Sequence, residues 1–497
     1  MTDASPVYRP RQRAGLVVGL AVFAVMLLVP PPGGLEPAAW RTAAAGLLMA
    51  AWWMTEAIPI PAASLLPLVL FPLLGVAPIG AAAASYANPL IFLFLGGFLI
   101  ALAMERWRLH RRLALNVIAR LGTRPARIVA GFMVASAFLS MWISNTATAM
   151  MMLPIGLSVI ELVESREGVD PADARAFGIV LMLAIAYAAS LGGVATLVGT
   201  PTNALLAAFM VDSYGFEVAF LDWLLLALPL TVVGLVVTFF VLTRLVYPIR
   251  VRSIPGGAEY LREELRKLGR LSPEERRVAV VFALTAGLWV TRPALEGWVP
   301  GLSDPGIAVL GAMLLFAVPL DWRRGTFALG WESTTRLPWG VLLLFGGGLS
   351  LASAIESSGL AAALGGAVGG LRGWPVLLLT LLVVTVIIFL TELTSNTATA
   401  AAFLPVLASI AVGLGQNPLL LMVPATIAAS CAFMLPVATP PNAIVYGSGF
   451  VSVPQMARAG VWLNLIFIVL VTLLAFALLP VVLDVRLGTV PSWAESP

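Results

Sequence analysis

The sequence SNTATA at residues 144–149 recurs letter for letter at residues 395–400, and each copy interrupts a long apolar stretch. Ser, Asn and Thr form helices less readily than the Leu and Ala residues around them. At membrane depth, such an interruption is tolerated only where it is buried in protein or lines a cavity. A single cluster could simply join helices by hydrogen bonds, but clusters that come in symmetric pairs favour a binding site.

The composition is that of a membrane protein. Of the 497 residues, 60% are hydrophobic and 11% are charged, whereas soluble domains carry about a quarter charged residues. Because about 20 apolar residues make one helical crossing, we expect full crossings at 14–30, 40–55, 60–77, 89–105, 176–211, 218–246, 278–292, 303–320, 338–356, 419–450 and 461–483. The expected fold is an all-α polytopic membrane protein with about eleven transmembrane helices and two re-entrant helical hairpins near 128–163 and 374–414.

The N-terminal segment carries Arg9, Arg11 and Arg13 before the apolar run 14–30. A cleaved signal peptide would show a small-residue cleavage site before a polar mature region. Another hydrophobic segment follows instead, which favours a first membrane helix.

The distribution of positive charge predicts the orientation of the chain. With the N-terminus in the cytoplasm, 25 of the 29 Lys and Arg residues fall in cytoplasmic segments, and Arg41, Arg292, Arg372 and Arg486 fall outside. Positive residues stay on the cytoplasmic side, so we expect a multi-pass protein of the bacterial inner membrane. The net charge of +4 then reflects membrane orientation and does not call for a nucleic-acid partner.

The chain divides into two halves that repeat each other. FLGGFL at 94–99 corresponds to LFGGGL at 344–349, and GTPTN at 199–203 corresponds to ATPPN at 438–442. Five expected crossings separate the two SNT motifs; because five is odd, the second hairpin opens to the opposite side and the repeat is inverted. Inverted repeats with interrupted helices place the binding site near the midplane and support alternating access.

We expect five segments along the chain. They are N-terminal scaffold helices at 1–88, a first repeat with its hairpin at 89–247, a cytoplasmic linker at 248–277, a second repeat with its hairpin at 278–484 and a C-terminal tail at 485–497. The linker is the one long polar insertion, and we interpret it as a solvated connector with a surface helix that lies on anionic lipid.

Each motif is expected at the N-terminus of a helix, because good helix formers follow from Ala147 and from Ala398. A second half-helix opens near Asn203 in the first repeat and near Asn442 in the second. Helix N-termini present free N–H groups and partial positive charge, which suits an anion.

The same breaks offer hydroxyl and carbonyl oxygens, the hard ligands that Na⁺ prefers. Ser140 lies four residues before Ser144, and Thr391 lies four before Ser395. One helical turn would put each hydroxyl on the face of its motif, which predicts two cation sites; the alternative is a pair of hydroxyls that cap helix ends. Glu392 has no acidic counterpart in the first half, where Met141 stands. An acidic residue at membrane depth is a functional candidate, though a place at the rim stays open.

At these residues the chain resembles the divalent anion:Na⁺ symporter family of dicarboxylate, citrate and sulfate carriers. The resemblance implies a homodimer in which a mobile transport domain moves like an elevator against a scaffold domain. It implies substrate contacts from the following residues: Ser144, Asn145, Thr146, Thr200, Pro201, Ser395, Asn396, Thr397, Thr439 and Pro440. It also implies one Na⁺ near Ser140, Asn145 and the Gly199 carbonyl, and a second near Thr391, Asn396 and the Ala438 carbonyl.

Other classes of protein fit the sequence less well. An ATP-driven pump needs a phosphate-binding Gly-Lys-Ser/Thr loop, and Lys267, the only lysine, follows Arg266. An enzyme with a nucleophile and a base is disfavoured, because His110 and Cys431 are the only His and Cys residues. We expect Na⁺ as the coupling ion, no cofactor, and a C4-dicarboxylate such as succinate, malate or fumarate as the substrate. A Na⁺-independent exchanger, a sulfate or citrate carrier and a channel stay open.

Overall fold

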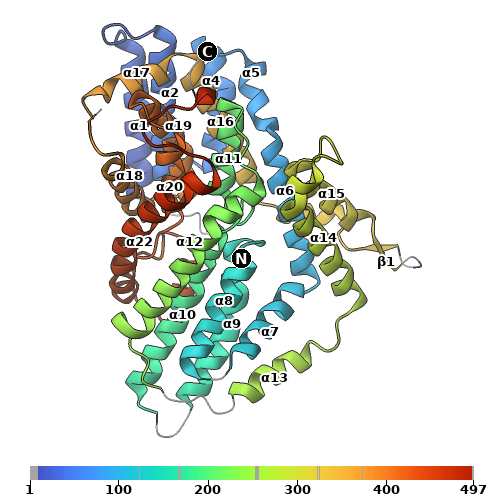
Figure 1. The fold of residues 1–497 in the computed structure, drawn as a ribbon. Coiled ribbons are helices and arrows are strands. Elements are labelled where there is room, and N and C mark those ends of the chain that lie inside the picture. Colours follow the sequence, from blue (N-terminus) through green and yellow to red (C-terminus); the bar gives the residue numbers. More distant parts are fainter. Residues whose placement is uncertain are drawn as a thin grey trace.

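The computed structural model describes residues 9–494 apart from 123, 166–168, 252–256, 322, 324 and 372. Arg372, which was expected on the non-cytoplasmic side, therefore lies outside the described residues. The regular secondary structure in these ranges is helical except for one short β-ribbon (Figure 1). Nine helices in the described ranges are long and apolar enough to cross a membrane, and shorter apolar helices accompany them. The expected polytopic all-helical class is confirmed.

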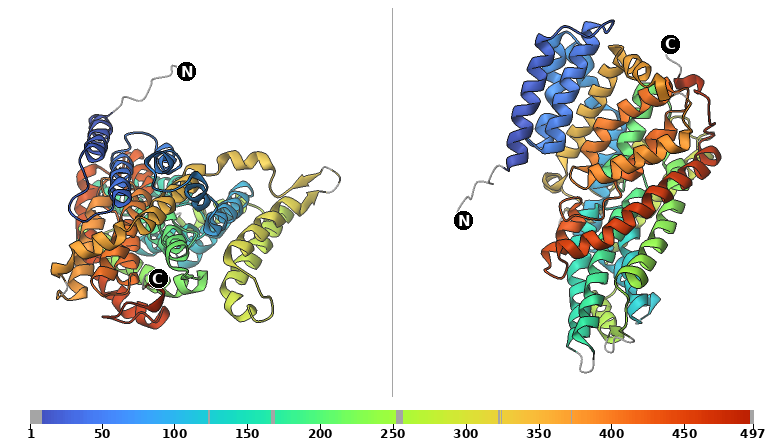
Figure 2. Two further views of the ribbon diagram at one scale, coloured as in Figure 1. Left: turned by 90° about the horizontal axis from the view of Figure 1, so that it is seen from above. Right: turned by 90° about the vertical axis from the view of Figure 1, so that its left-hand side faces the viewer.

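The N-terminal helices form a group of their own at one end of the molecule (Figure 2). They are α1 (Pro10–Leu28), α2 (Pro37–Thr55), α3 (Ile60–Ala63), α4 (Leu66–Leu74), α5 (Ile79–Ala84) and the short 3-10 turn η1 (Ser85–Ala87). α1 packs along α2, and the Trp40 indole N–H donates to the Met26 carbonyl at 2.7 Å. The expected crossing 60–77 consists of α3 and α4, which are separated at Ser64.

The two repeats have the same order of elements. The first comprises α6 (Pro89–Arg106), α7 (Leu109–Leu121), α8 (Pro125–Ser140), α9 (Asn145–Glu164), α10 (Pro171–Val194), α11 (Pro201–Tyr214) and α12 (Phe220–Phe240) with its π-helical end η2 (Val241–Val246). The second comprises α16 (Trp339–Ser357), α17 (Leu360–Ala367), η4 (Gly369–Leu371), α18 (Val376–Thr391), α19 (Asn396–Gly413), α20 (Leu419–Ala429), α21 (Pro440–Gly447) and α22 (Val453–Val482).

The linker and the early part of the expected second repeat, which precede these matching elements, form one stretch that adds further helices and the β-ribbon. Its elements are α13 (Gly257–Lys267), α14 (Pro273–Leu295), α15 (Asp304–Ala317), β1 (Pro319–Asp321), β2 (Thr326–Phe327) and η3 (Trp331–Arg336), and η5 (Ser492–Ala494) follows the second repeat. β1 and β2 pair antiparallel. The hydropathy pattern does not reveal this ribbon, because it is short and lies in a polar turn.

The two hairpins lie in opposite halves of the molecule. In Figure 1 the α8–α9 hairpin occupies the lower half, and the α18–α19 hairpin occupies the upper half. α10 packs against both arms of the first hairpin, as α20 does against both arms of the second. This arrangement is the one that an inverted repeat requires.

Two of the expected crossings are broken. The stretch 176–211 is divided between α10 and α11, and the stretch 419–450 between α20 and α21. Each break contains a Thr-Pro pair, and proline at the first helical position begins a new helix where the old one has stopped. Each repeat therefore contains a hairpin tip and a broken helix.

The close approach of α10 to α8 depends on a glycine. A Cβ on Gly192 would lie 2.2 Å from the Ala137 carbonyl oxygen, which is far inside van der Waals contact. Gly192 therefore lets the end of α10 reach the tip of the first hairpin.

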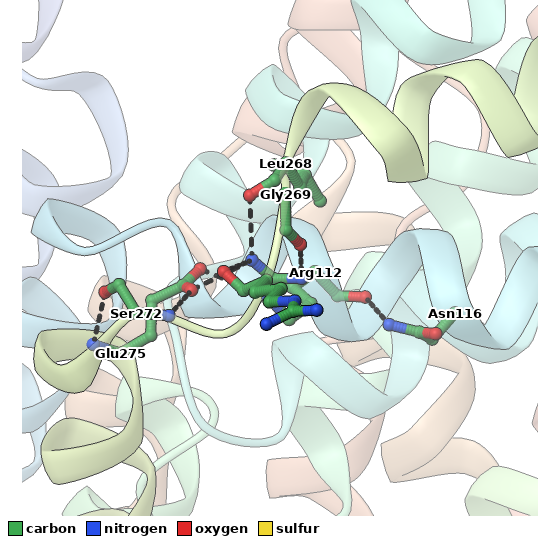
Figure 3. Close-up of polar contacts among 7 residues, drawn as sticks. Arg112, Asn116, Leu268, Gly269, Ser272 and Glu275 are labelled. Carbon is green, nitrogen blue, oxygen red and sulfur yellow. Dashed lines mark hydrogen bonds and ion pairs between the residues drawn. The ribbon is translucent and has the colours of Figure 1, made fainter.

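The linker is attached more firmly than the sequence suggests. α13 packs against α7, and the Arg112 guanidinium on α7 pairs with Glu275 at 2.9 Å (Figure 3). Arg112 also donates to the carbonyls of Leu268 and Gly269, at 3.0 and 2.9 Å. These contacts tie the linker to α7, while Glu259, Arg262, Glu263 and Arg266 on α13 are exposed.

A second ionic contact fixes α13 itself. Glu264 accepts from Lys267 at 2.8 Å and from Arg111 at 2.7 Å. The Lys267 hydrogen bond, aided by Arg111, holds the pKa of the Glu264 carboxyl below its usual value. The carboxylate therefore stays ionised at neutral pH.

We expect Arg112→Gln to lower the melting temperature of the detergent-purified protein by several degrees. The substitution leaves the Glu275 carboxylate, whose side chain is 8% exposed, without its ionic partner, and an uncompensated buried charge is costly. Arg266→Gln is the matched control on α13, because the Arg266 side chain is 81% exposed and exposed pairs contribute little. Equal melting temperatures for the two variants would contradict this account.

Candidate functional site

The two hairpin tips and the two broken helices meet at one cavity of about 710 Å³. All ten expected substrate-contact residues line it, together with Gly199 and Ala438. Residues some 250 positions apart in the sequence thus share one space. The structure brings the two motifs together as the repeat predicts.

The helices that follow the two hairpin tips and the two breaks all begin at this cavity. Ser144 is the N-cap of α9, and its hydroxyl accepts from the Ala147 N–H at 3.2 Å. Ser395 caps α19 in the same way, with Ala398 at 3.5 Å. Thr200 and Thr439 are the N-cap residues of α11 and α21. The starts of α9, α19 and α11 leave N–H groups without partners inside the helix, which gives the cavity partial positive charge. α21 differs, because it begins with Pro440 and Pro441, which have no N–H, and the Thr439 hydroxyl accepts from the Asn442 N–H at 3.3 Å.

The charged side chains around the cavity form pairs of opposite sign. Arg11 lies 3.9 Å from Glu56, and Arg336 lies 3.0 Å from Glu105. These are the charged side chains that line the cavity among the described residues. The positive character near the motifs therefore comes from helix ends and polar side chains.

The two expected cation ligands outside the cavity lie directly behind the motifs. The Ser140 hydroxyl donates to Asn145 Oδ1 at 2.5 Å, and the Thr391 hydroxyl donates to Asn396 Oδ1 at 2.6 Å. We expected each hydroxyl to meet its motif on one face of a continuous helix, but α8 ends at Ser140 and α18 ends at Thr391. The hydroxyls meet the motifs where the chain turns, and the spacing of one helical turn is not what brings them together.

Gly193 packs tightly against the first of these clusters. A Cβ on Gly193 would lie 2.5 Å from Asn145 Oδ1 and 3.0 Å from the Gly199 carbonyl oxygen. Only a glycine therefore lets α10 approach this group of hydroxyl, amide and carbonyl oxygens. Uncharged hard oxygens of this kind suit an alkali cation, and the residues fit Na⁺.

Two buried asparagines hold the broken helices open. Asn203 Nδ2 donates to the carbonyls of Gly193, Val194 and Thr196, at 3.2, 3.0 and 2.8 Å. The side chain is fully buried. It satisfies carbonyl groups that the break in the helix leaves without N–H partners.

Asn442 repeats this role in the second half. Its Nδ2 donates to the carbonyls of Ala432 and Leu435, at 3.2 and 3.1 Å. Both asparagines were noted in the sequence only as openers of half-helices. Asn203 and Asn442 are separated by the same number of residues as Gly199 and Ala438. This shared spacing is the signal that could have added the two asparagines to the site.

Arg11, Glu56, Glu105 and Arg336 were not expected at the site. They come from α1, the end of α2, α6 and η3, and only the folded structure brings them to the same cavity. Of the four, only Glu105 is marked by the repeat in the sequence, where it corresponds to Glu356.

The comparisons with known proteins agree with this geometry. Residues 11–483 match the family described as the sodium:sulfate symporter transmembrane region. The sodium-dependent dicarboxylate transporter SdcS of Staphylococcus saprophyticus is 43% identical over 484 residues, which cover 96% of this chain and 93% of that protein. SdcS of Staphylococcus aureus strain USA300 is 42% identical over 483 residues, with the same coverage.

Two solved structures share the fold at low identity. MtrF of Neisseria gonorrhoeae, an antimetabolite efflux pump, aligns with a TM-score of 0.56 and 13% identity over 95% of both chains. The YdaH transporter of Alcanivorax borkumensis aligns with a TM-score of 0.56 and 14% identity over 94% of this chain and 98% of that one.

An inverted repeat with two hairpin tips and two broken helices around one cavity defines a secondary transporter. The chain belongs to the sodium:sulfate symporter family. The resemblance noted in the sequence is thereby confirmed.

We expect Gly193→Ala to lower Na⁺-dependent uptake of labelled succinate by proteoliposomes about tenfold or more, because the added methyl group would collide with Asn145 and the Gly199 carbonyl and displace them. Gly287→Ala is the control, since a Cβ there would meet no atom within 4 Å. Normal uptake by the Gly193→Ala variant would remove the first cluster as a cation site.

Proposed function

We propose that the protein is a Na⁺-coupled symporter that takes up C4-dicarboxylates, such as succinate, malate or fumarate. The observation that carries the proposal is that two equivalent SNT motifs face one cavity. A dicarboxylate has two anionic ends, and each helix N-terminus suits one of them. The printed names of the SdcS relatives, at 43% and 42% identity, support the same substrate class and the same coupling ion.

In this proposal the substrate is held by Ser144–Thr146 and Thr200–Pro201 from the first repeat. The matching residues of the second repeat are Ser395–Thr397 and Thr439–Pro440. Hydroxyl groups and helix N-termini hold the anion without a buried basic side chain from either motif. Such a site releases its anion more readily than one built on salt bridges, which suits a carrier.

Two Na⁺ ions are proposed behind the substrate. The first is held by Ser140, Asn145 and the Gly199 carbonyl, and the second by Thr391, Asn396 and the Ala438 carbonyl. The short hydroxyl–amide contacts at Asn145 and Asn396 support this assignment. Each asparagine also lines the substrate cavity, so a bound cation would fix the side chain that the substrate contacts. That arrangement couples cation and anion binding.

The proposed orientation places the N-terminus in the cytoplasm of a bacterial cell and the protein in its inner membrane. The distribution of Lys and Arg supports it. Arg11, which lies near the N-terminus, lines the same cavity as the motifs. We therefore assign the cavity of this structure to the cytoplasmic side.

We further propose a homodimer with an elevator mechanism, as the family resemblance implies. The fixed part would include the N-terminal helices within 1–88. The moving part would include the hairpins and broken helices of the repeats at 89–247 and 278–484. Residues 248–277 would then be the linker, and 485–497 the tail. The midplane site between inverted repeats supports alternating access of this kind.

The test is uptake of labelled succinate by liposomes that contain the purified protein. We expect uptake into empty vesicles only with an inward Na⁺ gradient. Uptake that appears only in vesicles preloaded with succinate, and that ignores Na⁺, would make the protein an exchanger. Absence of succinate uptake in both kinds of vesicle would favour sulfate or citrate, and non-saturable flux would favour a channel.

We expect Asn145→Ala and Asn396→Ala each to abolish this uptake, because each asparagine belongs to the cavity and to one cation cluster. Size-exclusion chromatography of the purified variants checks that they keep the assembly of the wild type. Gly287→Ala serves again as the control, since its Cβ would meet open space. Wild-type uptake in either asparagine variant would contradict the proposed site.

A further inference from the structure

Glu392 is a buried acidic residue that the proposed transport cycle does not use. It directly follows Thr391, the last residue of α18, and it is 3% exposed. It therefore does not lie at the rim. A carboxylate buried at this depth needs partners that balance its desolvation.

The partners of Glu392 are all hydrogen-bond donors. Oε1 accepts from the backbone N–H groups of Phe433 and Met434 at 2.7 and 2.9 Å, and from Asn464 Nδ2 on α22 at 2.8 Å. Oε2 accepts from Met434 at 3.1 Å and from the Leu435 N–H at 3.0 Å. A protonated carboxyl would have to direct its own hydrogen toward one of these donors. The geometry is thus that of an ionised carboxylate, which only accepts.

These bonds orient the irregular segment between α20 and α21. Its N–H groups at residues 433–435 point to Glu392, while the carbonyls of Ala432 and Leu435 accept from Asn442. The segment ends at Ala438, whose carbonyl is a proposed cation ligand. Glu392 therefore fixes the path of the chain that carries this ligand.

The first repeat orients the equivalent segment without a charge. There the Thr196 hydroxyl accepts from the Gly199 N–H at 3.0 Å and donates to the Met141 carbonyl at 2.5 Å. Met141 occupies the position that corresponds to Glu392. The two cation clusters are alike in their neutral ligands and differ in this one carboxylate.

We propose that Glu392 is a positioning residue that gives the second cation site a fixed negative charge and makes it the tighter of the two Na⁺ sites. The inference rests on the two cation sites of the proposed function. A unit charge held one residue away from a ligand, inside the protein, acts on a cation with little screening. Arg11 donates to the neighbouring Leu393 carbonyl at 3.4 Å, but its side chain is 39% exposed and faces Glu56, so solvent and Glu56 reduce its opposing effect.

The two sites can be measured separately. Asn145→Ala leaves the second site intact, and Asn396→Ala leaves the first. Na⁺ binding is followed in detergent as the rise in melting temperature with NaCl, with choline chloride keeping the ionic strength constant. A cation that binds only the folded state raises this temperature according to its affinity.

We call the Na⁺ dissociation constant fitted to this rise in melting temperature the Na⁺ midpoint. We expect a lower Na⁺ midpoint in Asn145→Ala than in Asn396→Ala. Adding Glu392→Gln should raise the midpoint about tenfold in the Asn145→Ala background and leave it within about twofold in the Asn396→Ala background. Equal shifts in both backgrounds, or a tighter first site, would overturn the inference while leaving the two Na⁺ sites in place. A wild-type protein that does not respond to Na⁺ would overturn both this inference and the proposed symport.

A second variant tests the charge without disturbing Glu392. Met141→Glu in the Asn396→Ala background places a carboxylate at the equivalent position of the first site. We expect it to lower the Na⁺ midpoint of that site, and Met141→Gln is the uncharged control. An unchanged or raised midpoint for Met141→Glu relative to Met141→Gln would overturn the inference.

Discussion

A broken helix inside a membrane exposes N–H and carbonyl groups that lipid cannot solvate. The rest of this structure depends on how those groups find partners. Asn203 and Asn442, both fully buried, donate to carbonyls of the two broken segments. The helices that follow the two breaks begin at the cavity, at Thr200 and Thr439. Side chains thus offset the cost of breaking the helices, and the helix starts around the cavity form the proposed binding surface.

The inverted repeat explains why one cavity has two equivalent walls. Each half contributes a hairpin tip and a helix start, and a ligand with two anionic ends matches that arrangement. The halves are nevertheless unequal. In the first, the Thr196 hydroxyl accepts from the Gly199 N–H, whereas in the second the Glu392 carboxylate accepts from the N–H groups of residues 433–435. This difference would give the two proposed cation sites different charges.

Much of the architecture could be predicted from the sequence. The thickness of the bilayer and the need to hydrogen-bond every backbone N–H and carbonyl group within the protein leave few alternatives. The starts of α9 and α19 at Asn145 and Asn396 follow from the poor helix formers before them. The repeat also places the motifs in one cavity. These inferences rest on local composition and on symmetry, which a sequence displays directly.

Other features could not be predicted, because they depend on contacts between distant segments. Arg112 holds a linker more than 150 residues away, and Asn464 lies 72 residues from Glu392. The hydroxyl of Ser140 reaches Asn145 because the helix ends there, whereas the sequence suggested a continuous helical face. The β-ribbon and the charged pairs around the cavity likewise arise only when the chain folds.

In the proposed complex, one dicarboxylate spans the two motifs. A cryo-electron microscopy structure of the protein with Na⁺ and succinate would test this directly. We expect ligand density in the cavity with one carboxylate at Ser144–Thr146 and the other at Ser395–Thr397. Density that touches only one motif, or that lies outside this cavity, would contradict it.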